Sequence, residues 1–505
     1  MDRSQAERRV VAYLDDHDSE AVRLLQDLVH ARSLARQEGT TSQPGTLVFG
    51  LRRELGLVGS IEVVEQTLGP ASQNLIEVLA GSGDACFVID AHTDTVPEGQ
   101  PDRWFDGDPF SAAEGQVHYL GDRRIRIEVG RHQHEVTIRD RMARVWETKR
   151  TSRSLPIIYG RGTFDNKAAV ASTVMAMRAL GASGVKLAGT LVAAYVADEE
   201  ESATGVEGVA VGPDCWLAER GFLSGPTDSD GFLTRTSGVA LDGSYGYTPV
   251  VGHRGSCLLV LNVQGRAAHA STPFLGISAV EQMSRLLVAL ADDQSELIEQ
   301  RLLPMMDAEL LGPPTLAIGT TIAGGGVRRV VRQDGGLLVE RGGTNAVPDW
   351  CEATIDMRYP PGRAYPSDLE TFPDRIVGVV DSFLRERVST DGWDFSLEVP
   401  GERGSGFPCA LGRTREDAAA HPLVASALRV GSRVLGYQPD IETAPGGTDA
   451  TVMIHQGRIP TLVELGAAGG LSHDYHEFVE RDMIVAGAKV LALMAIDVLG
   501  LSEEL

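Results

Sequence analysis

The stretch LVAAYVADEEESATG, residues Leu191 to Gly205, constrains this chain more than any other. It begins as a continuous apolar run and ends in four consecutive acids, Asp198 to Glu201. An unbroken apolar run of this length predicts a central strand in a sheet that is covered on both faces. In open α/β sheets, ligands gather beyond the carboxyl ends of such strands. Four carboxylates there repel one another unless a cation lies among them, so the stretch predicts a divalent metal site.

An isolated acid run is more often a solvated loop, so the metal site needs support from the rest of the chain. The apolar run CFVIDA delivers His92 and Asp94, whose ring and carboxylate are suited to bind a metal and to orient its ligand. Asp242 ends another apolar run, and Asp165 follows a glycine turn before a predicted helix. Both acids have a plain alternative, because Asp also closes turns and caps helices.

Composition limits the classes of protein to consider. A chain of 505 residues exceeds one typical core and predicts two domains, or one domain with a large insertion. The formal net charge of −24 disfavours binding to nucleic acid and to anionic membranes. Five scattered cysteines without a CxxC pair argue against a disulfide framework and against a thiolate zinc site. The charged start of the chain and the lack of a membrane-length apolar run predict a cytoplasmic protein.

The α/β pattern is interrupted once along the chain. We expect residues 1–249 and 403–505 to form one catalytic domain, and 250–402 to be inserted in it with the order β-α-β-β-α-β. An extra β segment is expected at about 110–156, where the polar alternation of 117–145 predicts exposed antiparallel strands. Its three histidines, at positions 118, 132 and 134, are assigned no catalytic role.

Several short motifs follow one another in a fixed order: AHTDTVP (91–97), YGRGTFDNKA (159–168), ADEEESATG (197–205), GRAAHAS (265–271), GGTNAVPDWCEATIDMRYPP (342–361), GGTDA (446–450) and SHDYHEF (472–478). In order and style they resemble those of the co-catalytic metallopeptidase family that holds acetylornithine deacetylase, succinyl-diaminopimelate desuccinylase and glutamate carboxypeptidase. They span nearly the whole chain. The resemblance implies a zinc-peptidase-like α/β/α catalytic domain with an inserted ferredoxin-like α+β domain that serves as lid and dimerisation domain.

The resemblance also implies a set of metal ligands. His92, Asp165 and Asp242 would hold one divalent ion, and Asp165, Glu200 and His473 would hold the other, with Asp165 bridging the two. Nitrogen and oxygen donors without a thiolate suit Zn²⁺, with Co²⁺ or Mn²⁺ as alternatives.

Further roles follow from the same resemblance. Asp94 would orient a metal-binding histidine, and Glu199 would be the general base. His269 resembles the histidine that the inserted domain offers to the active site of a partner subunit, which implies a homodimer. Asn345 and Arg358 resemble residues that engage the substrate, often through its carboxylate.

The chain departs from the family pattern in three places. About forty residues between Asp108 and Ile157 are extra relative to compact members, and the stretch from Gly205 to Asp242 is long. The sequence LDGS replaces a more usual acid–proline pair. Near the C-terminal end, His476 competes with His473 for the ligand position, and the spacing to Glu477 favours His473.

The parts together predict a metal-dependent amide hydrolase, either a deacylase of N-acyl amino acids or a carboxypeptidase or dipeptidase. One alternative is an aminohydrolase that acts on a C–N bond outside ordinary peptide amides. Another is a metal-binding relative without activity, against which the intact Glu199 argues. The extra segments enter near the predicted site, so the acyl group and the amine of the substrate do not follow from the motifs.

Overall fold

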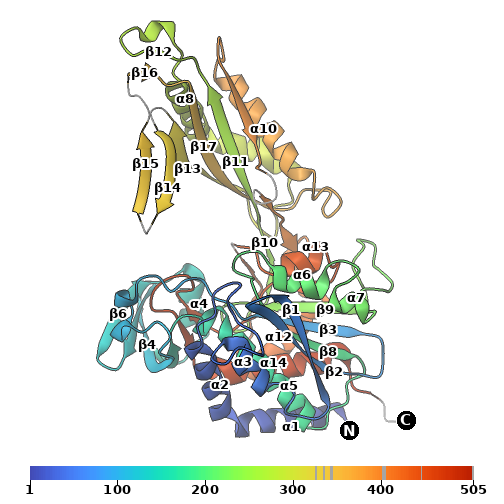
Figure 1. Cartoon of the computed structure of the whole chain (residues 1–505). Coiled ribbons are helices and arrows are strands. Elements are labelled where there is room, and N and C mark those ends of the chain that lie inside the picture. Colours follow the sequence, from blue (N-terminus) through green and yellow to red (C-terminus); the bar gives the residue numbers. More distant parts are fainter. Residues whose placement is uncertain (325–326, 334–335, 342–344, 401–404, 445, 503–505) are drawn as a thin grey trace. The chain divides into compact units, whose positions relative to one another are not determined.

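The computed structural model of the chain describes residues 1–324, 327–333, 336–341, 345–400, 405–444 and 446–502 (Figure 1). The chain divides into two compact units. The first comprises Met1–Gly252, Ala410–Ala444 and the chain from Thr448 onward. The second comprises His253–Cys409 and residues 446–447, and the sequence predicted an inserted domain at 250–402.

A six-stranded sheet forms the centre of the first unit, in the order β1-β2-β8-β3-β9-β22. Its strands are β1 (Ile61–Gly69), β2 (Ser72–Leu79), β8 (Thr190–Val196), β3 (Cys86–His92), β9 (Thr236–Leu241) and β22 (Thr461–Leu462). The strands β8, β3, β9 and β22 run parallel to one another. Every residue of β3 and β8 is buried, as their apolar runs predict. The carboxyl ends of these four strands therefore lie at one edge of the sheet.

Helices cover both faces of this sheet, which gives the predicted α/β/α layers. Five lie together on one side: α1 (Arg3–Asp16), α2 (Asp18–His30), α5 (Ala168–Ala182), α12 (Pro422–Leu435) and α14 (Asp482–Leu499). Three shorter helices pack on the other side: α6 (Thr204–Ala210), α7 (Trp216–Glu219) and α13 (Ala450–His455). The helix α5 is apolar nearly all round, which fits its central place under the sheet. In the described part of the chain, no helix is long and apolar enough to cross a membrane.

A second six-stranded sheet of the first unit has the order β23-β24-β7-β4-β5-β6. Its strands are β23 (Gly469–Gly470), β24 (Phe478–Glu480), β7 (Ser154–Tyr159), β4 (Ala113–Gly121), β5 (Arg124–Val129) and β6 (His132–Thr137). The prediction of exposed strands at 117–145 is wrong in two respects. One face is buried, since Val117 and Ile125 are fully covered. Residues Asp140–Thr148 form the helix α4, because Met142 and Trp146 recur at helical spacing and pack onto the sheet.

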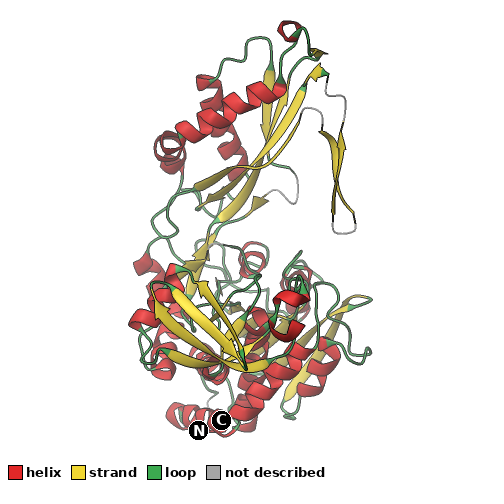
Figure 2. Cartoon of the chain, turned by 90° about the vertical axis from the view of Figure 1, so that its left-hand side faces the viewer, coloured by secondary structure: helices red, strands yellow, loops and turns green. Residues whose placement is uncertain are grey.

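The second unit has the ferredoxin-like order that the sequence predicted. Its main elements are β11 (Gly255–Gln264), α8 (Ala279–Asp292), β13 (Thr315–Gly324), β17 (Trp350–Tyr359), α10 (Phe372–Arg387) and β18 (Asp394–Glu398). The four strands pair in the order β13-β17-β11-β18. Both helices pack on one face of this sheet (Figure 2), where alternate residues of β11 are buried against them.

The remaining elements are short or peripheral. In the second unit, β12 (Ala268–His269) pairs with β16 (Ala346–Val347), and β14 (Val327–Gln333) pairs with β15 (Gly336–Arg341). Further short helices and strands are α3 (Leu47–Glu54), α9 (Gln294–Glu296), α11 (Arg415–Ala420), β10 (Val250–His253), β19 (Ser405–Gly406), β20 (Cys409–Ala410) and β21 (Glu442–Ala444).

Candidate metal centre

The candidate metal ligands come from both sheets of the first unit. From the first sheet, His92 is the last residue of β3, Asp242 follows β9, and Glu200 lies just beyond β8. From the second sheet, Asp165 lies in the turn after β7, and His473 lies in the loop between β23 and β24. The centre is therefore built where loops of the second sheet meet the carboxyl ends of the first.

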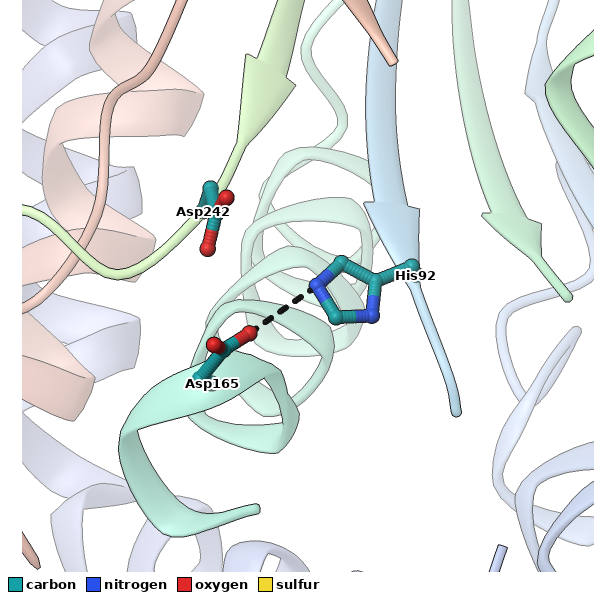
Figure 3. A group of neighbouring side chains, drawn as sticks. All are labelled: His92, Asp165 and Asp242. Atoms are coloured by element: carbon teal, nitrogen blue, oxygen red, sulfur yellow. Dashed lines mark ion pairs between the residues drawn. The ribbon is translucent and has the colours of Figure 1, made fainter. Parts of the chain in front are cut away.

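The five side chains form two groups of three that share Asp165. Ligand atoms of His92, Asp165 and Asp242 all lie within 4.8 Å of one another, and so do those of Asp165, Glu200 and His473. Figure 3 shows the first group, with the His92 ring and the two carboxylates turned toward one another. These are the two ligand sets that the resemblance implied.

The Asp165 carboxylate faces one histidine with each oxygen. Its Oδ1 lies 3.2 Å from His92 Nε2, and its Oδ2 lies 3.3 Å from His473 Nε2. His473 Nε2 also lies 3.0 Å from Glu200 Oε2. A carboxylate with one oxygen in each group has the geometry of a bridging ligand.

The alternative role of Asp165 as a helix cap does not fit the structure. The helix α5 begins at Ala168, and its N-cap residue is Lys167, without a side-chain hydrogen bond. Asp242 does make the contact of a turn residue, since the Gly243 N–H donates to its carboxylate at 2.5 Å. Its carboxylate nevertheless belongs to the first ligand group.

The consecutive acids after β8 have different environments. Asp198 anchors the loop, because its carboxylate accepts hydrogen bonds from Arg36 Nε at 3.1 and 3.2 Å. The backbone N–H groups of Glu199 and Glu200 donate to the two oxygens of Asp94, at 3.2 and 3.1 Å. Asp94 lies 3.6 Å from the nearer ring nitrogen of His92, so its hydrogen bonds go mainly to this loop. These hydrogen bonds hold the backbone of both glutamates, so each of the two side chains has its own fixed starting point.

The carboxylates of the centre are buried close together, and this shifts the pKa values of several groups. Burial raises the pKa of Glu199 well above its usual range, and the charges of Asp242 and Glu200 add to the effect. Burial, reinforced by the Asp165 charge, raises the pKa of Asp242 to about 8. Hydrogen bonds to Asp165 and Glu200 raise the pKa of His473 to about 10. The cluster thus favours positive charge among its carboxylates.

Unsatisfied polar atoms provide a test of whether a metal fits. Both ring nitrogens of His92 and the Oε1 atom of Glu200 are buried and have no hydrogen-bond partner in the described part of the chain. Buried polar atoms normally find partners. Imidazole and carboxylate groups that converge, with several buried donor atoms left without hydrogen bonds, form the donor set of a zinc-type centre, so the residues fit two divalent ions.

The sequence analysis assigned no role at the metal centre to two residues that hold its loops together. Arg161 and Glu477 form a buried ion pair, with 2.6 Å between Nη1 and Oε2. Glu477 Oε1 accepts the backbone N–H of Phe164 and of Asp165, each at 3.0 Å. Their only signals in the sequence were an arginine between two glycines and a glutamate used to set the spacing of His473.

The other histidines of the first unit lie outside the two ligand groups. His476, the competing candidate, is buried, and its Nδ1 lies 3.0 Å from the Tyr159 hydroxyl. Its ring centroid lies 4.3 Å from that of His134 on β6. His132 Nε2 lies 2.8 Å from Asp106, and His118 lies on β4, where its Nδ1 contacts Ser154 at 2.7 Å.

The three predicted residues of the second unit do not meet in one place. Asn345 Nδ2 lies 3.0 Å from His269 Nε2, and both residues are exposed. Arg358 lies on β17 and forms a two-pronged ion pair with Asp356, at 2.9 and 3.0 Å. Arg358 lies eight residues after Trp350, or about 27 Å along the strand, whereas Asn345 lies before Trp350. Within one chain, the second unit therefore presents two separate candidate contacts.

Comparison with known proteins gives a consistent result. The model of the family described as Peptidase family M20/M25/M40 matches residues 143–497. The succinyl-diaminopimelate desuccinylase of Methylobacterium radiotolerans is 25% identical over 468 residues, which cover 91% of this chain and 92% of that protein. A probable succinyl-diaminopimelate desuccinylase of Staphylococcus aureus is 25% identical over 334 residues, which cover 65% and 72%.

Solved structures share the fold over nearly the whole chain. The aminopeptidase PepT of Bacillus cereus superposes with a TM-score of 0.58 at 19% identity and covers 95% of this chain and 98% of its own. A Bacillus subtilis protein described as a dinuclear metal binding peptidase gives a TM-score of 0.56 at 14% identity, with 97% and 100% covered. Human carnosine dipeptidase 1 gives 0.54 at 18% identity, with 98% and 99% covered.

Proposed function

This chain belongs to peptidase family M20/M25/M40, and from that premise we propose that it hydrolyses the amide bond of N-acyl amino acids or small peptides with two divalent metal ions. The observation that carries the proposal is the Asp165 carboxylate, which offers one oxygen to each of two ligand groups. A single-metal or purely structural role would leave one of these groups without a purpose.

The ligand groups assign the metal-binding residues. His92 and Asp242 would complete the first site and Glu200 and His473 the second, with Asp165 shared. Zn²⁺ suits these donors best, and Co²⁺ or Mn²⁺ would also suit them. When bound, two such ions supply a water of lowered pKa and polarise the carbonyl group of the substrate.

Glu199 is the group that moves the proton. Its neighbour Glu200 belongs to a ligand group, whereas Glu199 itself does not, so its carboxylate remains available for proton transfer. In the proposed reaction Glu199 accepts a proton from the attacking water and later delivers it to the leaving amine. Asp94 keeps the loop in place through its hydrogen bonds to the backbone of both glutamates.

The second unit supplies contacts to the substrate in this proposal. The ring of His269 would donate a hydrogen bond to the oxyanion, and Asn345 lies beside it at 3.0 Å. Arg358 would hold a substrate carboxylate, for which it must exchange its present partner, Asp356. His269 lies past the end of β11. It resembles the histidine that the inserted domain offers to the active site of a partner subunit, so we propose a homodimer.

The compartment remains a prediction from the sequence. The five cysteines are scattered along the chain and all are buried, which suits the reducing cytoplasm that the sequence predicted.

The test combines metal analysis with a hydrolysis screen. The purified protein, loaded with Zn²⁺, Co²⁺ or Mn²⁺, is assayed against N-acyl amino acids, dipeptides and N-carbamoyl compounds. We expect two ions per chain and release of an amine from one of the first two classes. Hydrolysis of the carbamoyl compounds alone would favour the aminohydrolase alternative, and two bound ions without any hydrolysis would favour the inactive relative.

A further inference from the structure

We propose that Ser271 is a positioning residue that sets the tautomer of His269, so that the neutral ring carries its proton on Nε2 and acts as a hydrogen-bond donor. This inference rests on the proposed function of His269 as the group that meets the oxyanion. The tautomer is a property of the free protein, however, and it can be measured without any substrate.

The contacts of Nδ1 decide the tautomer. The backbone N–H of Ser271 donates to His269 Nδ1 at 3.2 Å. A backbone N–H can only donate, so Nδ1 must offer its lone pair there. The Ser271 hydroxyl lies 2.7 Å from the same nitrogen, and because hydroxyls rotate, it can donate as well. In a neutral imidazole with Nδ1 as acceptor, the proton is on Nε2.

The backbone around the ring is fixed by hydrogen bonds. His269 pairs with Ala346 in the short ladder of β12 and β16. The Thr272 N–H donates to the His269 carbonyl at 2.8 Å, which closes a turn around Ser271. The Ala270 N–H donates to the Asn345 carbonyl at 3.3 Å. The ring and the serine are thus held in one small rigid turn, so the contact with Nδ1 does not depend on a long flexible side chain.

The other ring nitrogen then determines how Asn345 is oriented. The side-chain amide of Asn345 lies 3.0 Å from His269 Nε2. With the proton on Nε2, this contact is a hydrogen bond when the amide presents its oxygen, a choice that the similar shapes of oxygen and NH₂ leave open. Donation then runs in one direction, from Ser271 to His269 to Asn345, and the Asn345 NH₂ group is left to donate.

The direction of these hydrogen bonds determines which kind of partner the turn can bind. Its donors are the Asn345 NH₂ group and the His269 Nε2–H group, which a substrate oxygen would take over from Asn345. It therefore suits an acceptor such as the carbonyl oxygen or the carboxylate of a substrate, and it does not suit an ammonium group. The opposite tautomer would present a lone pair at Nε2 and would repel a developing oxyanion.

The experiment measures the tautomer directly. Full-length protein with ¹⁵N-labelled histidine is studied by NMR, and the His269→Ala variant identifies the ring signals of His269. For the neutral ring we expect a pyridine-like Nδ1 and a protonated Nε2. A protonated Nδ1 in the wild-type neutral ring would overturn the inference.

Substitutions at Ser271 test the role of its hydroxyl. In Ser271→Ala we expect a measurable population of the other tautomer and a kcat about tenfold lower, the usual worth of one hydrogen bond, with little change in KM. Ser271→Thr keeps the hydroxyl and should retain both properties. Ser284→Ala, which removes an exposed hydroxyl from α8 in the same unit, is the matched control. An unchanged tautomer in Ser271→Ala would overturn the role of the hydroxyl.

These outcomes are separate from those that test the proposed function. If His269→Ala hydrolyses substrate as well as wild type does, the proposed role of His269 fails, whatever its tautomer. If His269→Ala is inactive while Ser271→Ala matches wild type in kcat and in tautomer, the function stands and the proposed role of the Ser271 hydroxyl is wrong.

Discussion

Arg161 and Glu477 form a buried ion pair, at 2.6 Å, that connects the two loops carrying Asp165 and His473. Glu477 accepts the backbone N–H of Asp165 at 3.0 Å, and Arg161 donates to the carbonyl of Asp474 at 3.1 Å. The loops come from different strands of the second sheet, so the pair sets the distance between one shared ligand and one terminal ligand. Removing one partner of a buried ion pair costs about 3–5 kcal/mol, because the other charge is left unpaired.

The first prediction concerns this pair. Glu477→Gln keeps an oxygen for the backbone N–H groups and removes the charge that holds Arg161. We expect metal affinity to fall about 10–100-fold, as for other residues that orient ligands, and the melting temperature to drop. Titration with Zn²⁺ measures the first effect. Glu201→Gln, at an exposed acid of the same run, is the control and should bind metal normally. Equal affinity in both variants would contradict the connecting role of Glu477.

The second prediction separates the two neighbouring glutamates. Glu199→Gln removes the proton acceptor and should lower kcat at least about a hundredfold, with metal content near wild type. Glu200→Gln removes a carboxylate of the second ligand group and should lower metal content. Metal analysis and steady-state kinetics on both variants give the answer. The assignment would be reversed if Glu199→Gln lost metal and Glu200→Gln kept it.

The third prediction concerns the shared ligand. In a crystal grown with zinc, we expect two ions about 3.5–4 Å apart with Asp165 between them. Asp165→Asn should weaken both sites, whereas His473→Ala should weaken one, because His473 belongs to a single group. Ions found away from Asp165, or loss of both ions in His473→Ala alone, would count against the shared arrangement.

The sequence allowed the first sheet to be predicted well, and the reason is local. The runs that end at His92 and Asp242 are mostly apolar, and such runs form strands buried on both faces. The acid run after β8 could be placed at the same edge for the same reason. The candidate ligands at this edge thus followed from pattern and from resemblance together.

For the second sheet, the sequence predicted antiparallel strands but not their buried face, because the signals for that burial are not local. Val117 and Ile125 alternate with polar residues, a pattern shared by solvated hairpins and by sheets with one buried face. What buries them is the helix α4 and the aromatic residues that join it in one core. The contact between Arg161 and Glu477 joins residues 316 positions apart, and no periodicity in the sequence predicts such a pair.

The fourth prediction concerns pH and stability. Burial lowers the pKa of His476 to about 4 in the folded chain, against about 6.5 for an unfolded histidine. Between these values the unfolded state binds the extra proton, so stability should fall as the pH falls from about 6.5 to 4. His476→Phe removes this proton and keeps a ring beside Phe105. Thermal melts across this range should show a smaller loss of melting temperature in the variant. A variant that lost stability as steeply as wild type would place the acid sensitivity elsewhere.

The last prediction concerns assembly. If His269 serves the site of a partner subunit, an inactive Glu199→Gln protein and an inactive His269→Ala protein should complement each other. A mixed dimer has one site with wild-type Glu199 and a wild-type His269 from the other chain, while its second site lacks both. With free exchange, half of the dimers are mixed, so activity should return to about a quarter of the wild-type value. Exchange is followed independently with two fluorescent labels, and a mixture of Glu199→Gln with wild type gives the reference for dilution. Full exchange without any recovery would mean that His269 acts in its own chain, since each mixed dimer would then carry one defect in each site.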